Sequence, residues 1–288
     1  MGADLADRDY FPELALASAV FLARRLQLPL FLEGDPGVGK TALAGKVAEI
    51  LGVVPIRLQC YAGIDRAQAL YEWDFAKQLL SMRGAGDSSS VYTAEFLITR
   101  PILRAVLDHP AVLLIDEIDR ADDEFEAFLL EVLEGRTLSI PDYRTITVEE
   151  PPFVPLSPFS SRHLLLASVG VVLTSNSTRE VHSAHERRCI YHWIDHPTRE
   201  RKAAIIRANV PELADGALAG VIARVVAELR AMPLTRAPGV AESIAFTRAA
   251  VALGRDTVEE ALGPALGVLV KQREDQELVG RAYRAGAG

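Results

Sequence analysis

Apolar residues along the 288-residue chain follow two patterns, and the change from one to the other divides the chain into two parts. In the first part, short apolar runs of the kind found in strands buried in a parallel sheet alternate with stretches of helical periodicity. In the second part, helical periodicity continues between proline and glycine turns. We therefore expect an α/β domain over residues 1–196, with a parallel sheet flanked by helices, and a small all-helical domain over residues 197–288.

The individual elements follow from the same spacing. In the first part, apolar runs predict strands at 30–33, 53–58, 111–115, 171–176 and 190–194, and a hairpin from 138–140 and 145–148. Apolar residues three and four apart predict helices at 12–26, 42–50, 59–82, 95–107 and 122–133, and in the second part at 199–208, 216–232, 240–253 and 257–279. The proline-rich stretch 149–161 is expected to be an extended loop.

The turn after the first predicted strand has the glycines, lysine and threonine of a phosphate-binding P-loop. Its residues are Gly34, Asp35, Pro36, Gly37, Val38, Gly39, Lys40 and Thr41. Glycines let backbone N–H groups turn toward an anion, and the start of the following helix adds its positive dipole end. We expect Lys40 on the β- and γ-phosphates of ATP and the Thr41 hydroxyl on Mg²⁺. A glycine turn with a chance lysine is the alternative, but every fixed position and both flanks fit the motif.

Two further strands end in polar residues that suit phosphate chemistry. The run at 111–115 leads into Asp116 and Glu117, and the run at 171–176 ends in Asn176. Alone, such acids also cap helices and such an asparagine also serves turns. Beside a P-loop, we expect Asp116 to hold Mg²⁺ through water, Glu117 to polarise the attacking water and Asn176 to orient it.

Cysteine and histidine residues do not indicate a metal centre. The segment 182–189 has two histidines and Cys189, but no further ligand at zinc spacing, so we favour no metal there. The adjacent Arg187 and Arg188 indicate more about function than the histidines of this segment do. Cys60 is far from Cys189 in the chain and neither belongs to a CxxC pair, so we predict no disulfide framework.

Charge and composition narrow the class of protein further. The net charge is −8, from 31 lysines and arginines against 39 acids, which argues against a general nucleic-acid-binding role. The first residues are acidic without a signal-peptide core, and no run approaches the roughly 18 apolar residues of a membrane span. We therefore expect a cytoplasmic protein.

Taken in order, these motifs resemble those of AAA+ ATPases and, among them, the MoxR group. The strings at 34–41, 114–119, 173–176 and 187–188 stand in the order of Walker A, Walker B, sensor 1 and arginine finger. Longer strings at 59–66, 71–74, 116–132 and 187–194 are similar to CoxD-type ATPases, which are associated with maturation of the molybdenum–copper site of aerobic carbon monoxide dehydrogenase. The resemblance covers roughly residues 10 to 275.

The resemblance implies a mode of action as well as a fold. It implies a homo-hexameric ring that works beside a partner with a von Willebrand A domain and on a client metalloenzyme. It also implies that Arg187 or Arg188 is an arginine finger that reaches the γ-phosphate of a neighbouring subunit. The hairpin at 138–148 is then the pre-sensor insertion of the family.

The chain departs from the MoxR pattern at two places. MoxR relatives often carry a sensor 2 arginine at the start of a lid helix, but here residues 238–243 read Pro-Gly-Val-Ala-Glu-Ser, with Arg236 and Arg248 only nearby. About Phe153 to Gly170 looks like extra chain, which we interpret as a neutral surface insertion, since loops tolerate added length.

Three functions are compatible with these motifs. The leading hypothesis is an ATP-hydrolysing chaperone that remodels or matures a partner protein. The second is a nucleotide-dependent binding switch in which turnover is incidental. The third, a nucleic-acid motor, shares the P-loop but conflicts with the acidic charge.

Overall fold

The computed structural model describes residues 1–84, 91–108, 110–134, 137–140, 143–147, 169–181, 183–213, 216–255 and 257–286. Contacts group the chain into two compact units. The first consists of Met1, Leu14–Glu33 and Thr41–Trp193, and the second of Gly2–Glu13, Gly34–Lys40 and Ile194–Gly288. The P-loop backbone up to Lys40 therefore groups with the C-terminal helices, whereas Thr41 groups with the sheet.

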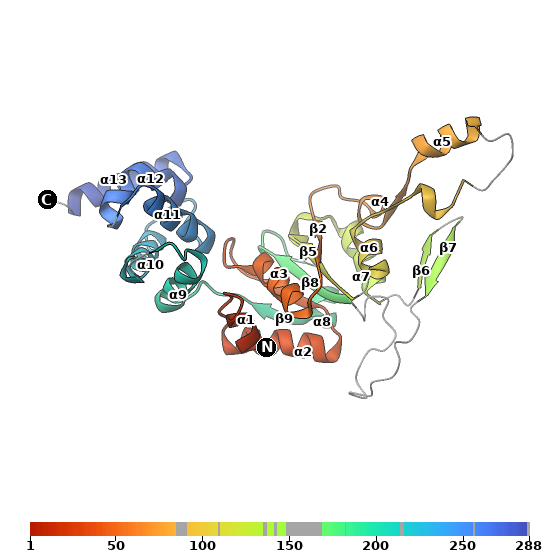
Figure 1. Ribbon diagram of the computed structural model, residues 1–288, viewed down its shortest axis with the longest axis horizontal. Coiled ribbons are helices and arrows are strands. Elements are labelled where there is room, and N and C mark those ends of the chain that lie inside the picture. Colours follow the sequence, from red (N-terminus) through yellow and green to blue (C-terminus); the bar gives the residue numbers. More distant parts are fainter. Residues whose placement is uncertain are drawn as a thin grey trace. The chain divides into compact units, whose positions relative to one another are not determined.

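A five-stranded parallel sheet, in the order β2-β5-β8-β1-β9, forms the centre of the first unit (Figure 1). The strands are β1 (Leu30–Glu33), β2 (Pro55–Gln59), β5 (Ala111–Asp116), β8 (Val169–Ser175) and β9 (Ile190–Trp193). Glu33 lies opposite Ser175, and Gln59 lies opposite Asp116. Because all strands are parallel, their carboxyl ends meet at one edge of the sheet, where ligands bind in open α/β folds.

The predicted parallel sheet is confirmed, and so is the reason for its apolar runs. All six residues of β5 are buried, as expected for a central strand covered on both faces. The helices of this unit are α2 (Leu14–Leu26), α3 (Lys40–Leu51), α4 (Arg66–Ala69), α5 (Phe75–Gly84), α6 (Pro101–Leu107), α7 (Asp123–Glu134) and α8 (Ser183–Arg188). Fully buried Phe31, Ile115 and Leu129 belong to one continuous core.

The helix predicted over 59–82 is wrong. A capping box of Asp65 and Gln68 begins the short helix α4, and the chain then forms β3 (Tyr71–Trp73) before α5. Strand β3 pairs antiparallel with β4 (Leu97–Thr99). Tyr71 and Trp73 pack against the core from this strand, whereas Phe75 is exposed. Pairing with a distant strand has overridden local helical periodicity.

The helix predicted over 95–107 is also shorter than expected. A single 3-10 turn (Ala94–Phe96) and β4 precede α6, which begins at Pro101. Proline suits the first helical position because that position needs no N–H donor, but it cannot continue a helix from the preceding residues.

The predicted hairpin is confirmed, with β6 (Thr137–Ile140) antiparallel to β7 (Arg144–Thr147) in a sheet of its own. Residues 148–168 lie outside the described part of the chain. The proline-rich loop and nearly all of the Phe153–Gly170 segment therefore stay as sequence predictions, except that Val169 and Gly170 belong to β8.

Helices make up most of the second unit. They are α1 (Gly2–Ala6), α9 (Arg199–Asn209), α10 (Gly216–Arg230), α11 (Val240–Ala252), α12 (Val258–Leu269) and α13 (Arg273–Gly286). The single helix predicted over 257–279 is instead two helices, because Val270 adopts an extended conformation after α12. Among the described residues, no helix is long and apolar enough to cross a membrane.

Candidate nucleotide-binding site

The P-loop backbone follows a path that glycine permits. Gly34 has a φ of +150°, and a Cβ atom at this position would lie 2.4 Å from the carbonyl oxygen of Ile194. A side chain at residue 34 would therefore displace backbone. Within the loop, Val38 is buried and Asp35 and Pro36 are exposed.

Lys40 is buried at the base of the loop. Its Nζ donates hydrogen bonds to the carbonyl oxygens of Gly34, at 2.6 Å, and Asp35, at 2.9 Å. These two bonds hold the ammonium group against the loop that the sequence predicts to bind phosphate. Only 5 % of Lys40 is exposed, so its charge acts in surroundings of low polarity, where its attraction for an anion is strong.

Gly37 brings the loop close to the start of α11. It has a φ of +82°, and its carbonyl oxygen accepts a hydrogen bond of 3.1 Å from the N–H of Val240. A Cβ atom on Gly239 would lie 3.2 Å from Gly37. Gly239 lies in the segment 238–243, where the MoxR resemblance leads one to expect a sensor 2 arginine, and it allows two backbone segments to approach closely.

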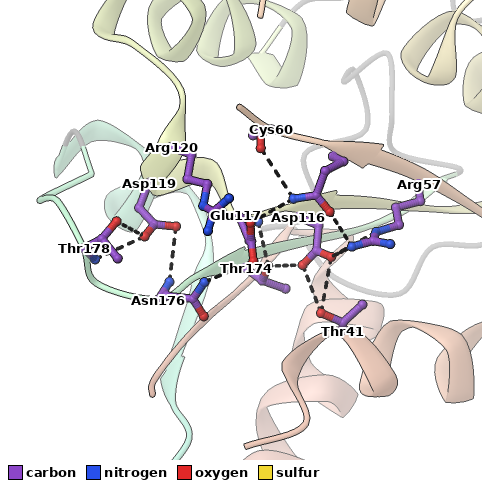
Figure 2. Close-up of polar contacts among 11 residues, drawn as sticks. Thr41, Arg57, Cys60, Asp116, Glu117, Asp119, Arg120, Thr174, Asn176 and Thr178 are labelled. Atoms are coloured by element: carbon purple, nitrogen blue, oxygen red, sulfur yellow. Dashed lines mark hydrogen bonds and ion pairs between the residues drawn. The ribbon is translucent and has the colours of Figure 1, made fainter. Parts of the chain in front are cut away.

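Thr41 and Asp116 meet at the sheet edge, as the sequence predicts. The Thr41 hydroxyl donates to Oδ1 of Asp116 at 3.0 Å, although 75 residues separate them in the chain. Oδ1 also accepts a 2.5 Å hydrogen bond from the Thr174 hydroxyl. Figure 2 shows both hydroxyls and the Arg57 side chain around this carboxylate.

Arg57 is the charged neighbour of Asp116. Its Nε and Nη2 donate to Oδ2 of Asp116 at 3.0 and 2.5 Å, and Nη2 also bonds to the side chain of Gln59. Asp116 is 2 % exposed and the Arg57 side chain 55 %, so the pair joins a buried carboxylate to a solvated cation. A carboxylate and a hydroxyl are the hard oxygen donors that Mg²⁺ prefers, so Asp116 and Thr41 fit that ion.

Glu117 has an unfavourable backbone conformation. Its φ of 58° and ψ of 51° lie in the left-handed region, which is uncommon for a residue with a side chain and occurs at functional sites. Its N–H donates to the Thr174 hydroxyl at 3.0 Å. Its carboxylate accepts hydrogen bonds from Gln59 at 3.0 Å and Asn176 at 3.4 Å, and pairs with Arg120 at 3.0 Å. The structure thus brings together two residues for which the sequence predicts roles on one water molecule.

Asp119 fixes the segment that carries Asn176. Its Oδ1 accepts from the N–H of Asn176 at 3.2 Å. Its Oδ2 accepts from the N–H and the hydroxyl of Thr178, at 3.1 and 2.5 Å. Since Asp119 is 3 % exposed, these bonds satisfy a buried carboxylate and hold the end of β8 beside Glu117.

Sequence reasoning missed several of these contacts. The residues concerned are Arg57, Gln59, Asp119, Arg120 and Thr174. Polar Arg57 and Gln59 alternate with apolar Ile56 and Leu58, which is a signal of a strand with one polar face. That signal does not say which strand lies alongside, so it could not pair Arg57 with Asp116.

Arg187 and Arg188 lie in the last turn of α8, and both are exposed. Nη1 of Arg188 donates to the carbonyl oxygen of Ala184 at 3.1 Å. Among the residues that the structure describes, the Arg187 side chain has no hydrogen bond or ion pair. The action of either arginine on a neighbouring subunit stays a prediction.

Burial, more than charge, alters the acidity of the nearby thiol. Burial, followed by the carboxylate of Asp116, raises the pKa of Cys60 to about 12. The Cys60 thiol is therefore protonated at neutral pH and serves as an apolar side chain of the core.

A glycine-rich loop at a helix start, with acids and an amide at the ends of adjacent parallel strands, defines a P-loop fold of the AAA+ type. The AAA domain family, dynein-related subfamily, matches residues 29–189, which is more than half of the 288-residue chain. The protein therefore belongs to this family.

Similarities to individual proteins cover a short segment or have low sequence identity. Over 54 residues the chain is 43 % identical to midasin from Giardia intestinalis. The matched segment is 19 % of this chain and 1 % of midasin. The RuvB Holliday junction branch migration motor of Thermotoga maritima has a TM-score of 0.46 and 16 % identity, over 86 % of this chain and 66 % of RuvB. A variant of that RuvB has a TM-score of 0.47 and 17 % identity over the same shares.

Proposed function

We propose that this protein is a Mg²⁺-dependent ATPase. The observation that carries the proposal is the cluster at the sheet edge, where Thr41 bonds to Asp116 and Asn176 bonds to Glu117. A hydroxyl and an acid suited to a metal ion thus lie beside an acid and an amide suited to a water molecule. Membership of the AAA domain family supports the same activity.

Each residue of this cluster has a role that its chemistry allows. Bound Mg²⁺ would neutralise charge on the phosphates, and Thr41 and Asp116 would hold it. Lys40 would exchange its bonds with the loop carbonyl oxygens for bonds to phosphate oxygens. Glu117 would accept a hydrogen bond from the attacking water and Asn176 would orient that water, so that the water oxygen attacks the γ-phosphorus as the bond to ADP breaks.

At the level of the cell, we propose a cytoplasmic chaperone of the MoxR type. Its functional domains are an ATP-binding domain over residues 1–196 and a helical lid over residues 197–288. It assembles as a homo-hexamer, works with a von Willebrand A domain partner and matures a client metalloenzyme, for which a molybdenum hydroxylase such as carbon monoxide dehydrogenase is the leading candidate. These proposals rest on the motif strings at 59–66, 116–132 and 187–194.

The proposed activity predicts a clear separation of binding from turnover in Glu117→Gln. Glutamine keeps the shape of the side chain but is a far weaker acceptor for the proton of water. We expect ATP affinity close to wild type and a hydrolysis rate lowered by about 10²-fold or more, the usual weight of a general base. Equilibrium binding and phosphate release measure the two quantities.

A matched control is Glu124→Gln, because Glu124 is an exposed acid in the first turn of the nearby helix α7. This variant should hydrolyse ATP at the wild-type rate. Undiminished hydrolysis by Glu117→Gln would exclude the role of Glu117. Absence of ATP binding by the wild-type protein would overturn the proposed function as a whole.

A nucleotide-dependent binding switch is the second candidate, and one contact favours it. The Glu117 carboxylate is paired with Arg120 at 3.0 Å, a contact that occupies its oxygen Oε2. A switch should bind its partner with an affinity that depends on ATP or ADP, while partner addition leaves the slow ATPase rate unchanged. For the chaperone, a von Willebrand A domain protein should change that rate. Retention of DNA in a low-salt filter-binding assay would instead support a nucleic-acid motor.

A further inference from the structure

Thr174 is the residue through which β8 contacts both neighbouring acids of the candidate site. It is 1 % exposed. Its hydroxyl donates to Oδ1 of Asp116 at 2.5 Å and accepts the N–H of Glu117 at 3.0 Å (Figure 2). One oxygen atom therefore touches two consecutive residues that we expect to act on different ligands, a metal ion and a water molecule.

Both contacts depend on the chemistry of a hydroxyl group. The bond to Asp116 uses the single hydroxyl proton, and the bond from Glu117 uses a lone pair of the same oxygen. Valine has nearly the same shape as threonine but can make neither bond. Because Asp116 is 2 % exposed, loss of the hydroxyl would leave a buried carboxylate with one donor fewer, where water does not readily replace it.

The contact with Glu117 acts on its backbone. Glu117 has a φ of 58° and a ψ of 51°, a conformation that persists only when its surroundings hold it. The end of β8 and the residue after it hold Glu117 at two points: Thr174 accepts its N–H, and Nδ2 of Asn176 donates to Oε1 of its carboxylate at 3.4 Å. Thr174 therefore helps to set the direction from which the Glu117 side chain projects.

The contact with Asp116 can persist when a metal ion is bound. The Thr41 hydroxyl donates to the same oxygen at 3.0 Å, but in the proposed function it is itself a ligand of Mg²⁺. Thr174 has no such second task. Its bond would stay in place and keep the Asp116 carboxylate oriented while Thr41 turns to the ion.

We propose that Thr174 is a positioning residue that aligns the Asp116 carboxylate with Glu117. The inference rests on the proposed ATPase function, and it gives Thr174 no contact with ATP, Mg²⁺ or the attacking water. Thr174 acts through the two acids alone. Loss of its hydroxyl should therefore impair hydrolysis much more than binding of ATP by the P-loop.

The first test compares Thr174→Val, which removes the hydroxyl, with Thr174→Ser, which keeps it. We expect valine to lower kcat by about tenfold or more, as loss of a hydrogen bond to a charged group does, and to change the KM for ATP by less than about threefold. Serine should keep kcat within about threefold of the wild type. A wild-type kcat in Thr174→Val, or an equal loss in Thr174→Ser, would overturn the role.

Thr247→Val is the matched control for this substitution. Thr247 of α11 is also fully buried, and its hydroxyl donates to the carbonyl oxygen of Ser243 at 2.8 Å. The control variant therefore loses a buried hydroxyl that does not bond to either acid. It should keep the wild-type kcat.

A double-mutant cycle tests action through Glu117. At saturating Mg²⁺, adding Thr174→Val to Glu117→Gln should lower the residual rate by less than about threefold, because the carboxylate that Thr174 positions has already been replaced. A further loss of about tenfold in this background would mean that Thr174 acts independently of Glu117, against the proposal.

ATP binding tests the contact with Asp116 without turnover. In the Glu117→Gln background, Mg²⁺ should strengthen ATP binding relative to binding in EDTA. Thr174→Val should reduce this gain by about threefold or more and leave the affinity in EDTA unchanged. An undiminished gain would contradict the positioning of Asp116.

Failure of this role and failure of the proposed function give different results. A wild type that neither binds nor hydrolyses ATP overturns both, whereas an active wild type with an equally active Thr174→Val overturns the role alone. Unfolding temperatures measured without nucleotide check that each variant folds. A Thr174→Val protein that binds ATP in EDTA as the wild type does has a folded P-loop, so its lower kcat cannot be explained by misfolding.

Discussion

At the scale of single residues, Asp116, which we propose as a Mg²⁺ ligand, is held by three other side chains. Its two oxygens accept hydrogen bonds from Thr41, Thr174 and Arg57. The Arg57 guanidinium lies on Oδ2, so a divalent cation at this carboxylate is repelled by a neighbouring positive charge. We therefore expect Arg57 to weaken Mg²⁺ binding in the proposed reaction.

Arg57→Ala should lower the Mg²⁺ concentration that gives half-maximal ATP hydrolysis, by about threefold to tenfold at low ionic strength. Because more than half of the Arg57 side chain is exposed, salt should reduce the difference. Mg²⁺ titrations of the ATPase rate at two salt concentrations measure the effect. Arg104→Ala, which removes an exposed arginine paired with Asp108, is the control. A higher Mg²⁺ requirement in Arg57→Ala would mean that Arg57 positions Asp116 for the ion.

At the scale of elements, helix α8 with its two arginines is tied to α7 by a buried charge cluster. Glu126 of α7 is 1 % exposed and accepts a hydrogen bond from Nη2 of Arg179, which also donates to the carbonyl oxygen of Ala121 at 2.7 Å. His185 of α8 is fully buried, with Nε2 3.8 Å from Oε2 of Glu126. Glu126 thus lies where α7 and α8 approach each other.

Glu126→Ala should destabilise the protein by about 1–3 kcal/mol, because the charge-assisted hydrogen bond between the buried Glu126 carboxylate and Arg179 would be lost. Asp123→Ala is the matched control: Asp123 pairs with the same arginine at 3.0 Å, but its side chain is 93 % exposed, so about 0–1 kcal/mol is expected. Denaturant unfolding of both variants measures the difference. Equal effects would mean that burial does not set the strength of this cluster.

Element prediction succeeded where the local signal and the tertiary environment agree. The strand at β5, the helix after the P-loop and the β6–β7 hairpin were predicted from apolar runs, periodicity and turn residues. It failed at 59–82, where β3 forms because a partner strand, β4, lies about 25 residues further along the chain. Strand pairing between distant segments is a tertiary interaction that periodicity within one segment does not contain.

At the scale of the whole molecule, the proposed ring makes each active site depend on two subunits. Arg187 and Arg188 are exposed on α8, as side chains that act on a neighbour must be. An arginine finger contributes about 10³–10⁵ in rate, so the loss of the acting arginine should abolish measurable turnover.

Mixing variants tests this dependence. Lys40→Ala lacks a working P-loop but keeps both arginines, whereas Arg187→Ala or Arg188→Ala keeps the loop. Each variant alone should be inactive, if the arginine removed is the finger, and mixed assemblies should regain part of the ATPase rate. Activity that stays absent in both mixtures would contradict action between subunits. Size-exclusion chromatography with light scattering confirms that the mixed proteins assemble.

The sequence by itself determined the P-loop motif and the parallel sheet, since each depends on residues that are contiguous or evenly spaced. Only the tertiary structure decided which side chains act together. Arg57 meets Asp116 because β2 pairs with β5, and Asp119 holds Asn176 because β5 pairs with β8. Burial and distance between remote residues are properties of the fold, and no pattern along the chain records them.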